Sequence, residues 1–287
     1  MGKYNHRVLL GSGQGPIAIV SDDGSKFEFQ VEYKPLGRPN TETEGNDAAI
    51  LPNGDVVFTF SAGAEEVKPD GTVVWRFDNP VGTETQGVTP LPGGHFMVGE
   101  THSGGVAYLR ELDAMGKVVS SITVNSGTSG AAHSQFRAIR KTPQGTYLVT
   151  YLGLNKAREI DATGKMIREF PCGSFVAVRL PNGNTLCSCG KSSRVIEVDP
   201  QNKIVWEANK TTVPLLNQFA AGIQRLPNGN TAMCSFPDGA GNSGPPRCFE
   251  VTPDFKVVWQ LKTPTDHLWT ALEFIDPAAW VDGVPLR

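Results

Sequence analysis

The chain has 287 residues, of which 39% are hydrophobic, and a formal net charge of -3 at pH 7. This is enough for a large buried core, and the small net charge argues against a nucleic-acid-binding protein. No run approaches the roughly 20 apolar residues needed to cross a bilayer, so we expect no membrane span. The 32 Gly and 21 Pro are spread along the chain and indicate many turns between short strands.

The first segment, residues 6–33, reads as three strands, the second and third joined by an Asp-Asp-Gly turn. Five related turns follow along the chain, and the last two share the heptapeptide RLPNGNT. They lie at Ile50–Asp55, Leu91–His95, Thr142–Thr146, Arg179–Thr185 and Arg225–Thr231, and their last glycines are spaced by 40, 51, 38 and 46 residues. Pro presets φ and Gly accepts positive φ, so each sequence predicts a tight turn of a repeated unit.

A second signature follows each of these turns, with copies such as EEVKPDGTVVWRF and IEVDPQNKIVWEA. Each copy reads as a strand, a tight turn and another strand, so one repeat contains four antiparallel strands, A to D. This pattern predicts a β-propeller blade. The C-terminal HLWTALEFIDP reads as a lone strand A, which completes a blade with the three N-terminal strands. We therefore predict an all-β fold: one propeller domain over residues 1–287, with six blades, or seven as the alternative.

The combination LPNGNT, EVDP and KIVW, with QFRAIRKTPQGTYLV and FAAGIQRLPNGNT, resembles the PQQ-like propeller repeat proteins of bacteria over nearly the whole chain. Many such proteins carry secretion signals, so the resemblance implies an extracytoplasmic protein, although no signal peptide is visible in MGKYNHRVLLGSGQG. The related quinoprotein dehydrogenases carry adjacent cysteines near the quinone. This chain has no adjacent Cys pair, so we expect no PQQ and no other cofactor.

In such a blade the A–B and C–D turns lie on one face, and the D–A connections and B–C loops lie on the opposite face, which we call the loop face. The loop face is the expected binding face, because variable loops on rigid strands carry function. The candidate ligand-binding residues that map there are Glu44, Asp47, Glu84, Gln86, Glu100, His102, His133, Gln135, Arg137, Gln218, His267 and Trp269. Carboxylates and amides bind sugar hydroxyls, Arg binds a carboxylate, and an exposed Trp stacks on a sugar ring.

Two classes of function stay open on these residues. The first is a non-catalytic module that binds an oligosaccharide, a uronate or a protein partner. The second is a polysaccharide lyase or glycoside hydrolase, with His102 or His133 as acid or base and Arg137 against a uronate carboxylate. Facing carboxylates would serve a hydrolase instead. No metal site is predicted, because the histidines lack ligand spacing.

Some residues recur at one position of the repeats and are therefore predicted to be structural. They are Glu66, Glu111, Glu159, Glu197 and Glu250 in strand C of all five full repeats, and Trp75, Trp206 and Trp259 in strand D of three of them. The five cysteines, Cys172, Cys187, Cys189, Cys234 and Cys248, are predicted to be mostly buried, with a disulfide left open. His133 and Arg137 occupy positions that are apolar or Gly in other repeats, which favours a functional role for them.

Overall fold

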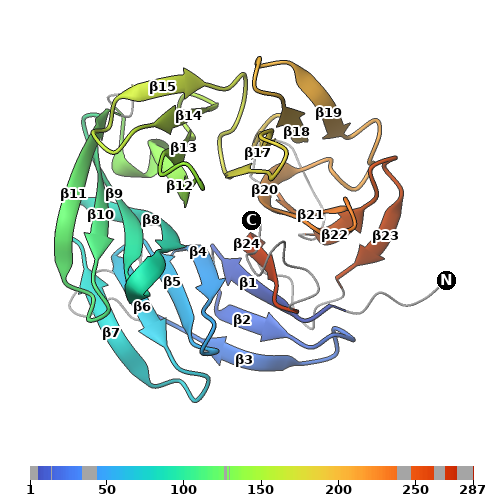
Figure 1. Cartoon of the computed structure of the whole chain (residues 1–287). Helices are drawn as coiled ribbons and strands as arrows, with labels where there is room; N and C mark the ends of the chain where they lie inside the picture. Colours follow the sequence, from blue (N-terminus) through green and yellow to red (C-terminus); the bar gives the residue numbers. More distant parts are fainter. Residues whose placement is uncertain are drawn as a thin grey trace.

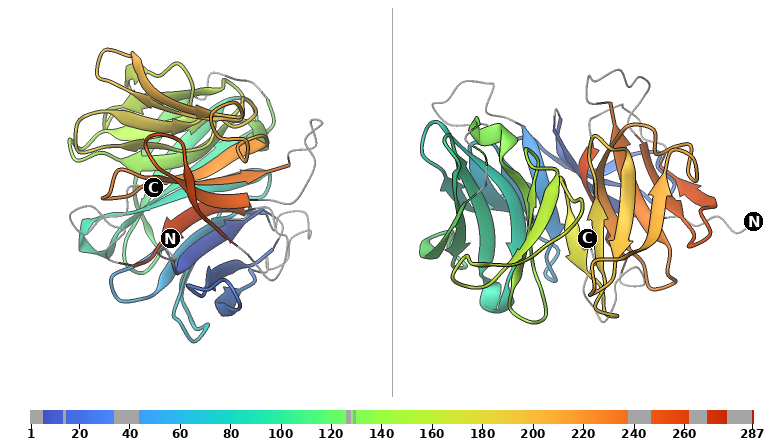
Figure 2. Two further views of the ribbon diagram at one scale, coloured as in Figure 1. Left: turned by 90° about the vertical axis from the view of Figure 1, so that its right-hand side faces the viewer. Right: turned by 90° about the horizontal axis from the view of Figure 1, so that it is seen from above.

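The computed structural model describes residues 6–13, 15–33, 44–125, 128, 130–237, 247–261, 269–276 and 287. Six four-stranded antiparallel sheets form a ring around a central channel, along which Figure 1 is viewed. The side view in Figure 2 shows the sheets standing next to one another around the ring. The prediction of six blades is therefore confirmed, and the alternative of seven is wrong.

One blade, which we call the closing blade, is assembled from both ends of the chain. It contains β24 (Trp269–Phe274), β1 (Val8–Ser12), β2 (Ile17–Val20) and β3 (Phe27–Val31), in that order. Val8 pairs with Phe274 and Leu10 with Leu272, so the last described strand is the innermost strand of the blade. This is the predicted closure, in which strand A comes from the C-terminal segment.

The other five blades are each continuous in sequence, and in each the first strand of the blade is an end strand of its sheet. The first two contain β4 (Gly45–Ile50), β5 (Val56–Phe60), β6 (Gly63–Val67) and β7 (Val73–Asp78), then β8 (Thr83–Pro90), β9 (Phe96–His102), β10 (Val106–Leu112) and β11 (Val118–Asn125). The third contains β12 (Phe136–Lys141), β13 (Tyr147–Tyr151), β14 (Lys156–Ile160) and β15 (Met166–Glu169). The fourth and fifth contain β16 (Ala177–Arg179), β17 (Thr185–Ser188), β18 (Arg194–Val198) and β19 (Ile204–Asn209), then β20 (Phe219–Arg225), β21 (Thr231–Phe236), β22 (Arg247–Val251) and β23 (Val257–Gln260).

Short turns connect strands A and B as the repeats predict. Gly54, Gly145 and Gly183 adopt φ of 89°, 83° and 86°, a region that favours glycine. Two 3-10 turns, η2 (Pro92–Gly94) and η3 (Ala132–Ser134), complete the regular structure of the described residues. Apolar side chains of adjacent sheets pack against each other and form the core between blades. Gly99, for example, faces the ring of Phe136 in the next blade so closely that a Cβ there would overlap it.

The glutamates and tryptophans that recur in the repeats mostly join one blade to the next. Glu159 binds Arg179 at 2.5 Å, Glu197 binds Arg225 at 2.8 Å, and each arginine belongs to the following blade. Trp206 stacks on Phe255 with ring centroids 5.4 Å apart. These glutamates and tryptophans therefore recur because they hold neighbouring blades together, which is the structural role predicted for them.

Candidate functional site

The inner strands carry β-bulges at their loop-face ends, and these bulges hold several channel residues. The ladder register skips Asn46 between Gly45 and Asp47. It skips Gln86 together with Gly87 in β8, and Arg137 together with Ala138 in β12. A bulge leaves its residues out of the ladder and re-aims their side chains. Three successive blades thus bring Asn46, Gln86 and Arg137 toward one another.

Six residues form a polar group that we call the mouth cluster: Asn46, Glu44, Glu84, Gln86, His133 and Arg137. Nη1 of Arg137 donates to Gln86 Oε1 at 2.7 Å and lies 3.5 Å from Asn46 Oδ1. His133 Nδ1 lies 3.0 Å from Glu84 Oε2 and 3.7 Å from Glu44 Oε2. His133 and Arg137 therefore lie together with the acidic side chains of Glu44 and Glu84.

The contacts of His133 define its protonation state. Nη2 of Arg137 lies 2.6 Å from His133 Nε2, and a guanidinium has only donors to offer. Nε2 therefore accepts, the proton sits on Nδ1, and Nδ1–H donates to Glu84. The ring is neutral in this arrangement, because a second ring proton would set two donors against each other.

Exposure differs sharply across the mouth cluster. The side chain of His133 is 45% exposed and that of Glu44 is 34% exposed, whereas Arg137 is 7% exposed. Burial lowers the pKa of Arg137, and the charges of Glu44 and Glu84 oppose that shift. With neutral His133, two carboxylates and one guanidinium leave the cluster with one net negative charge.

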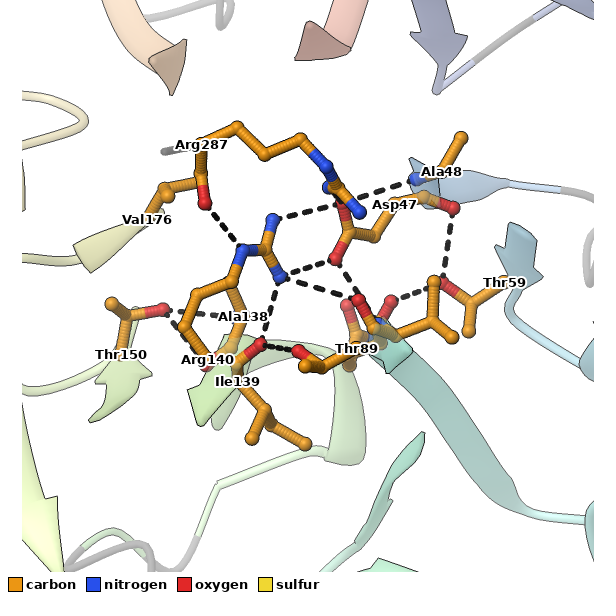
Figure 3. Close-up of polar contacts among 12 residues, drawn as sticks. Asp47, Ala48, Thr59, Thr89, Ala138, Ile139, Arg140, Thr150, Val176 and Arg287 are labelled. Carbon is orange, nitrogen blue, oxygen red and sulfur yellow. Dashed lines mark hydrogen bonds and ion pairs between the residues drawn. The ribbon is translucent and has the colours of Figure 1, made fainter. Parts of the chain in front are cut away.

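A second group, which we call the central network, consists of Asp47, Arg140, Glu273 and Arg287. Figure 3 shows how Asp47, Arg140 and Arg287 lie in it. Nη1 and Nη2 of Arg140 donate to the two oxygens of Asp47 at 2.6 and 3.1 Å. Nη1 of Arg287 donates to Asp47 Oδ1 at 3.0 Å, and its Nε lies 2.7 Å from Glu273 Oε2. The C-terminal marker in Figure 1 lies at the centre of the ring, consistent with Arg287 in the channel.

The two carboxyls of the central network differ in acidity. Burial would raise the pKa of Asp47, but Arg140, Arg287 and the Val88 N–H outweigh it and hold the pKa below its ordinary value. Burial raises the pKa of Glu273 to about 7, because Arg287 and the Ile50 N–H offset only part of the desolvation. At neutral pH, Asp47 is therefore ionised and Glu273 is partly protonated.

His102 and Glu100 form a separate pair beside the mouth cluster. His102 Nε2 lies 2.6 Å from Glu100 Oε1, and Arg110 Nη2 lies 2.9 Å from the same oxygen. Burial alone would raise the pKa of Glu100, but the hydrogen bonds from Arg110 and His102 outweigh burial and hold the pKa below its ordinary value. The Gln135 side chain donates to the backbone oxygen of His102. His102 therefore lies on the same face as His133, as the blade map requires.

Trp269 and Gln218 do not join these groups, and Asp47 belongs to the central network instead of the mouth cluster. Trp269, predicted to stack on a sugar at the rim, is 2% exposed and lies in the hydrophobic core, because β24 pairs it with Ser12 inside the closing blade. Gln218 is fully buried immediately before β20. His267 lies outside the described residues. Asp47 lies in the channel as predicted but is engaged by two arginines.

Three residues of the central network, Arg140, Glu273 and Arg287, were not predicted from the sequence. Glu273 is the one charged residue of the strand WTALEF, and this was an available signal. Arg140 gave no such signal, because its strand FRAIRK also contains Arg137 and Lys141. Arg287 lies 13 positions beyond the end of β24, and nothing in the repeat pattern places it.

Three further observations bear on chemistry. Cys172 and Cys189 form a disulfide with Cα atoms 5.6 Å apart, and Cys187, Cys234 and Cys248 are buried free thiols. Within the described ranges, no group of three His, Cys, Asp or Glu side chains is arranged to hold a metal ion. Nor does that part of the chain contain a helix with the length and hydropathy required to span a membrane.

Comparison with solved structures supports the fold. A protein of unknown function from Bacteroides caccae is 26% identical, with 99% of each chain covered and a TM-score of 0.81. Virginiamycin B lyase from Staphylococcus aureus is 15% identical over 83% of this chain and 76% of its own, with a TM-score of 0.56. A luciferin-regenerating enzyme is 15% identical over 81% of this chain and 80% of its own, with a TM-score of 0.57. At these identities the two enzymes share the fold alone.

No curated protein matches the chain. A family model described as "Mal s 1 allergenic protein-like" matches residues 12–219, which is most of the chain. This match does not confirm the resemblance to PQQ-like repeat proteins beyond the shared propeller fold. The chain belongs to the Mal s 1 allergenic protein-like family.

Proposed function

We propose that the mouth cluster binds a neutral oligosaccharide. The observation that carries this proposal is the Glu44 carboxylate, which is 34% exposed and lies 3.7 Å from His133 and 3.9 Å from Arg137. At these distances the two partners hold the carboxylate in place without a close hydrogen bond to either of them. A carboxylate held in this way at a channel mouth has acceptor oxygens left for sugar hydroxyls.

The charges favour a neutral ligand over a uronate. Arg137 is the residue that would bind a ligand carboxylate, but it is buried and its two Nη groups already donate to Gln86 and His133. The carboxylates of Glu44 and Glu84 outnumber the one guanidinium, that of Arg137, so the mouth cluster carries one net negative charge. An anionic sugar would therefore meet repulsion without a free guanidinium to offset it.

Binding is favoured over acid–base catalysis by the state of His133. Both ring nitrogens are engaged, Nδ1 with Glu84 and Nε2 with Arg137. A general base needs a nitrogen within reach of the substrate proton, so His133 would first have to leave Arg137.

A polysaccharide lyase or hydrolase is the second candidate function. The contact of His133 with Glu84 favours it, because a carboxylate orients a histidine for proton transfer. Two structural neighbours are enzymes by name, virginiamycin B lyase and a luciferin-regenerating enzyme.

The experiment is calorimetric titration of the wild type with a panel of neutral and uronate-containing oligosaccharides. We expect a neutral member to bind and Glu44→Gln to weaken it about tenfold or more, the loss expected for a charge-assisted hydrogen bond. Glu111→Gln is the matched control, because it removes a carboxylate paired with His95 at 2.8 Å beside a turn of the opposite face. Binding that Glu44→Gln leaves unchanged, or binding of uronates only, would refute the proposal. Turnover abolished by His133→Ala would favour the second candidate.

We also propose an extracytoplasmic location. The disulfide between Cys172 and Cys189 supports it, since disulfides persist in oxidising compartments. Fractionation of the native organism, with alkylation of free thiols before lysis, tests this: a reduced pair in the cytoplasmic fraction would refute it.

A further inference from the structure

The guanidinium of Arg287 is held by carboxylates from two blades. Asp47 of β4 lies 3.0 Å from Nη1, and Glu273 of β24 lies 2.7 Å from Nε. The three side chains are between 0 and 6% exposed. Two carboxylates that engage different edges of the planar fork select a guanidinium over an ammonium ion.

The backbone of Arg287 is bound as well as its side chain. Nε of Arg140, in β12, donates to the carbonyl oxygen of Arg287 at 2.6 Å, and Arg140 is fixed in turn by its two bonds to Asp47. Three inner strands therefore contribute groups that recognise both parts of an arginine residue, the guanidinium and the adjacent carbonyl. Figure 3 shows Asp47 and Arg140 beside Arg287.

The site also contains a hydrogen-bond acceptor that Arg287 does not use. Glu273 Oε1 is buried and has no hydrogen-bond partner in the described structure. A small cavity lies beside Asp47, Arg140 and Arg287 and is also lined by Asn46 and Thr270. Unpaired buried acceptors are rare in folded proteins, and here the acceptor belongs to a side chain that already binds a guanidinium.

We propose that Asp47, Arg140 and Glu273 form a recognition site for an arginine residue, which Arg287 occupies in this structure and which a peptide arginine can enter in its place. Asp47, Arg140 and Glu273 are not members of the mouth cluster, so the proposal goes beyond the proposed function, although Asn46 and Arg137 of that cluster line the adjoining cavity. A tethered group competes at an effective concentration in the millimolar range. Arg287 therefore keeps weak ligands out, and its removal opens the site.

The test compares wild type and Arg287→Ala by thermal denaturation with argininamide, which supplies both the guanidinium and the carbonyl. We expect a concentration-dependent rise of Tm in Arg287→Ala at millimolar argininamide and no comparable rise in the wild type. Lysinamide, with the same charge and backbone, should bind about tenfold more weakly. Adding His133→Ala to Arg287→Ala should leave the response to argininamide unchanged, which separates this site from the mouth cluster.

Arg225→Ala is the matched control, because it removes an arginine that lies 2.8 Å from Glu197 between two other blades. Glu273→Gln combined with Arg287→Ala should weaken the response. If Arg287→Ala does not fold, Arg287→Lys keeps the charge but loses the two-edged contact, and argininamide should stabilise it. Equal responses to argininamide and lysinamide, the same response in Arg225→Ala, or no response in either Arg287 variant would overturn the proposal.

Discussion

Replacement of Glu273 by Gln should change how stability depends on pH. In the folded protein, burial raises the pKa of Glu273 to about 7, from an ordinary value of 4.5. Between these values the folded state holds a proton that the unfolded state has lost. The stability that protonated Glu273 contributes is therefore fully present below about pH 4.5 and is lost as the pH rises through 7. The glutamine side chain of the variant cannot titrate, so the unfolding free energy of the variant does not fall in this way.

The magnitude follows from the size of the shift. One pKa unit corresponds to about 1.36 kcal/mol, so the wild type should lose about 3 kcal/mol between pH 4.5 and 8 relative to Glu273→Gln. Glu273 is fully buried, which makes solvent screening small. A Gln side chain retains an oxygen that can accept from Arg287, so the variant should keep the local geometry.

The assay is urea denaturation of both proteins at half-unit steps from pH 4.5 to 8, with the difference in unfolding free energy plotted against pH. Glu197→Gln is the matched control. Glu197 is also buried and paired with an arginine, but although burial raises its pKa, bonds from Asn184 and Arg225 hold it below the ordinary value. Its difference curve should be flat over this window. A flat curve for Glu273→Gln, or one of opposite slope, would show that Glu273 is ionised throughout and refute the reasoning.

Two further changes test the packing between and within blades. Gly99→Ala should cost roughly 1–3 kcal/mol or more, because its Cβ would overlap the Phe136 ring and lie 2.7 Å from Ile139 Cδ1; Gly130→Ala, whose Cβ would have 3.8 Å to its nearest neighbour, should be close to neutral in the same urea measurement. Replacement of both Cys172 and Cys189 by Ser should cost about 3 kcal/mol, since the disulfide closes a loop with a sequence separation of 17. Wild type denatured with and without reductant checks this second value, and identical midpoints would contradict it.

The fold was predictable because its information is local and repeated. Each Leu-Pro-Asn-Gly turn marks the junction of strands A and B, and the incomplete units at the two ends of the chain imply closure. His133 and Arg137 could be singled out for a related reason, because residues that depart from a repeat stand out against it. The repeat did not predict that Glu84 would contact His133.

The central network was not predictable, because it depends on which strand positions face the channel. Arg140 and Glu273 lie in the inner strands of different blades, and the side chains reach each other only across the ring. The position of Trp269 was mispredicted for the same reason. An aromatic residue near a loop was expected at the rim, but the pairing of β24 with β1 places Trp269 inside the closing blade.

The closing blade has a consequence for how the molecule is made. Strand β1 pairs with β24, and among the described residues these are the first and last strands in chain order. Until β24 has left the ribosome, β1 is an edge strand with unpaired backbone groups, which is a template for wrong partners. Joining the blade also requires a slow kind of contact, one between residues far apart in the sequence, such as Val8 and Phe274.

A circular permutant that connects β24 directly to β1 and opens the chain at a turn between two complete blades would make this pairing local. It should fold faster and aggregate less than the natural order, with the same ring at the end.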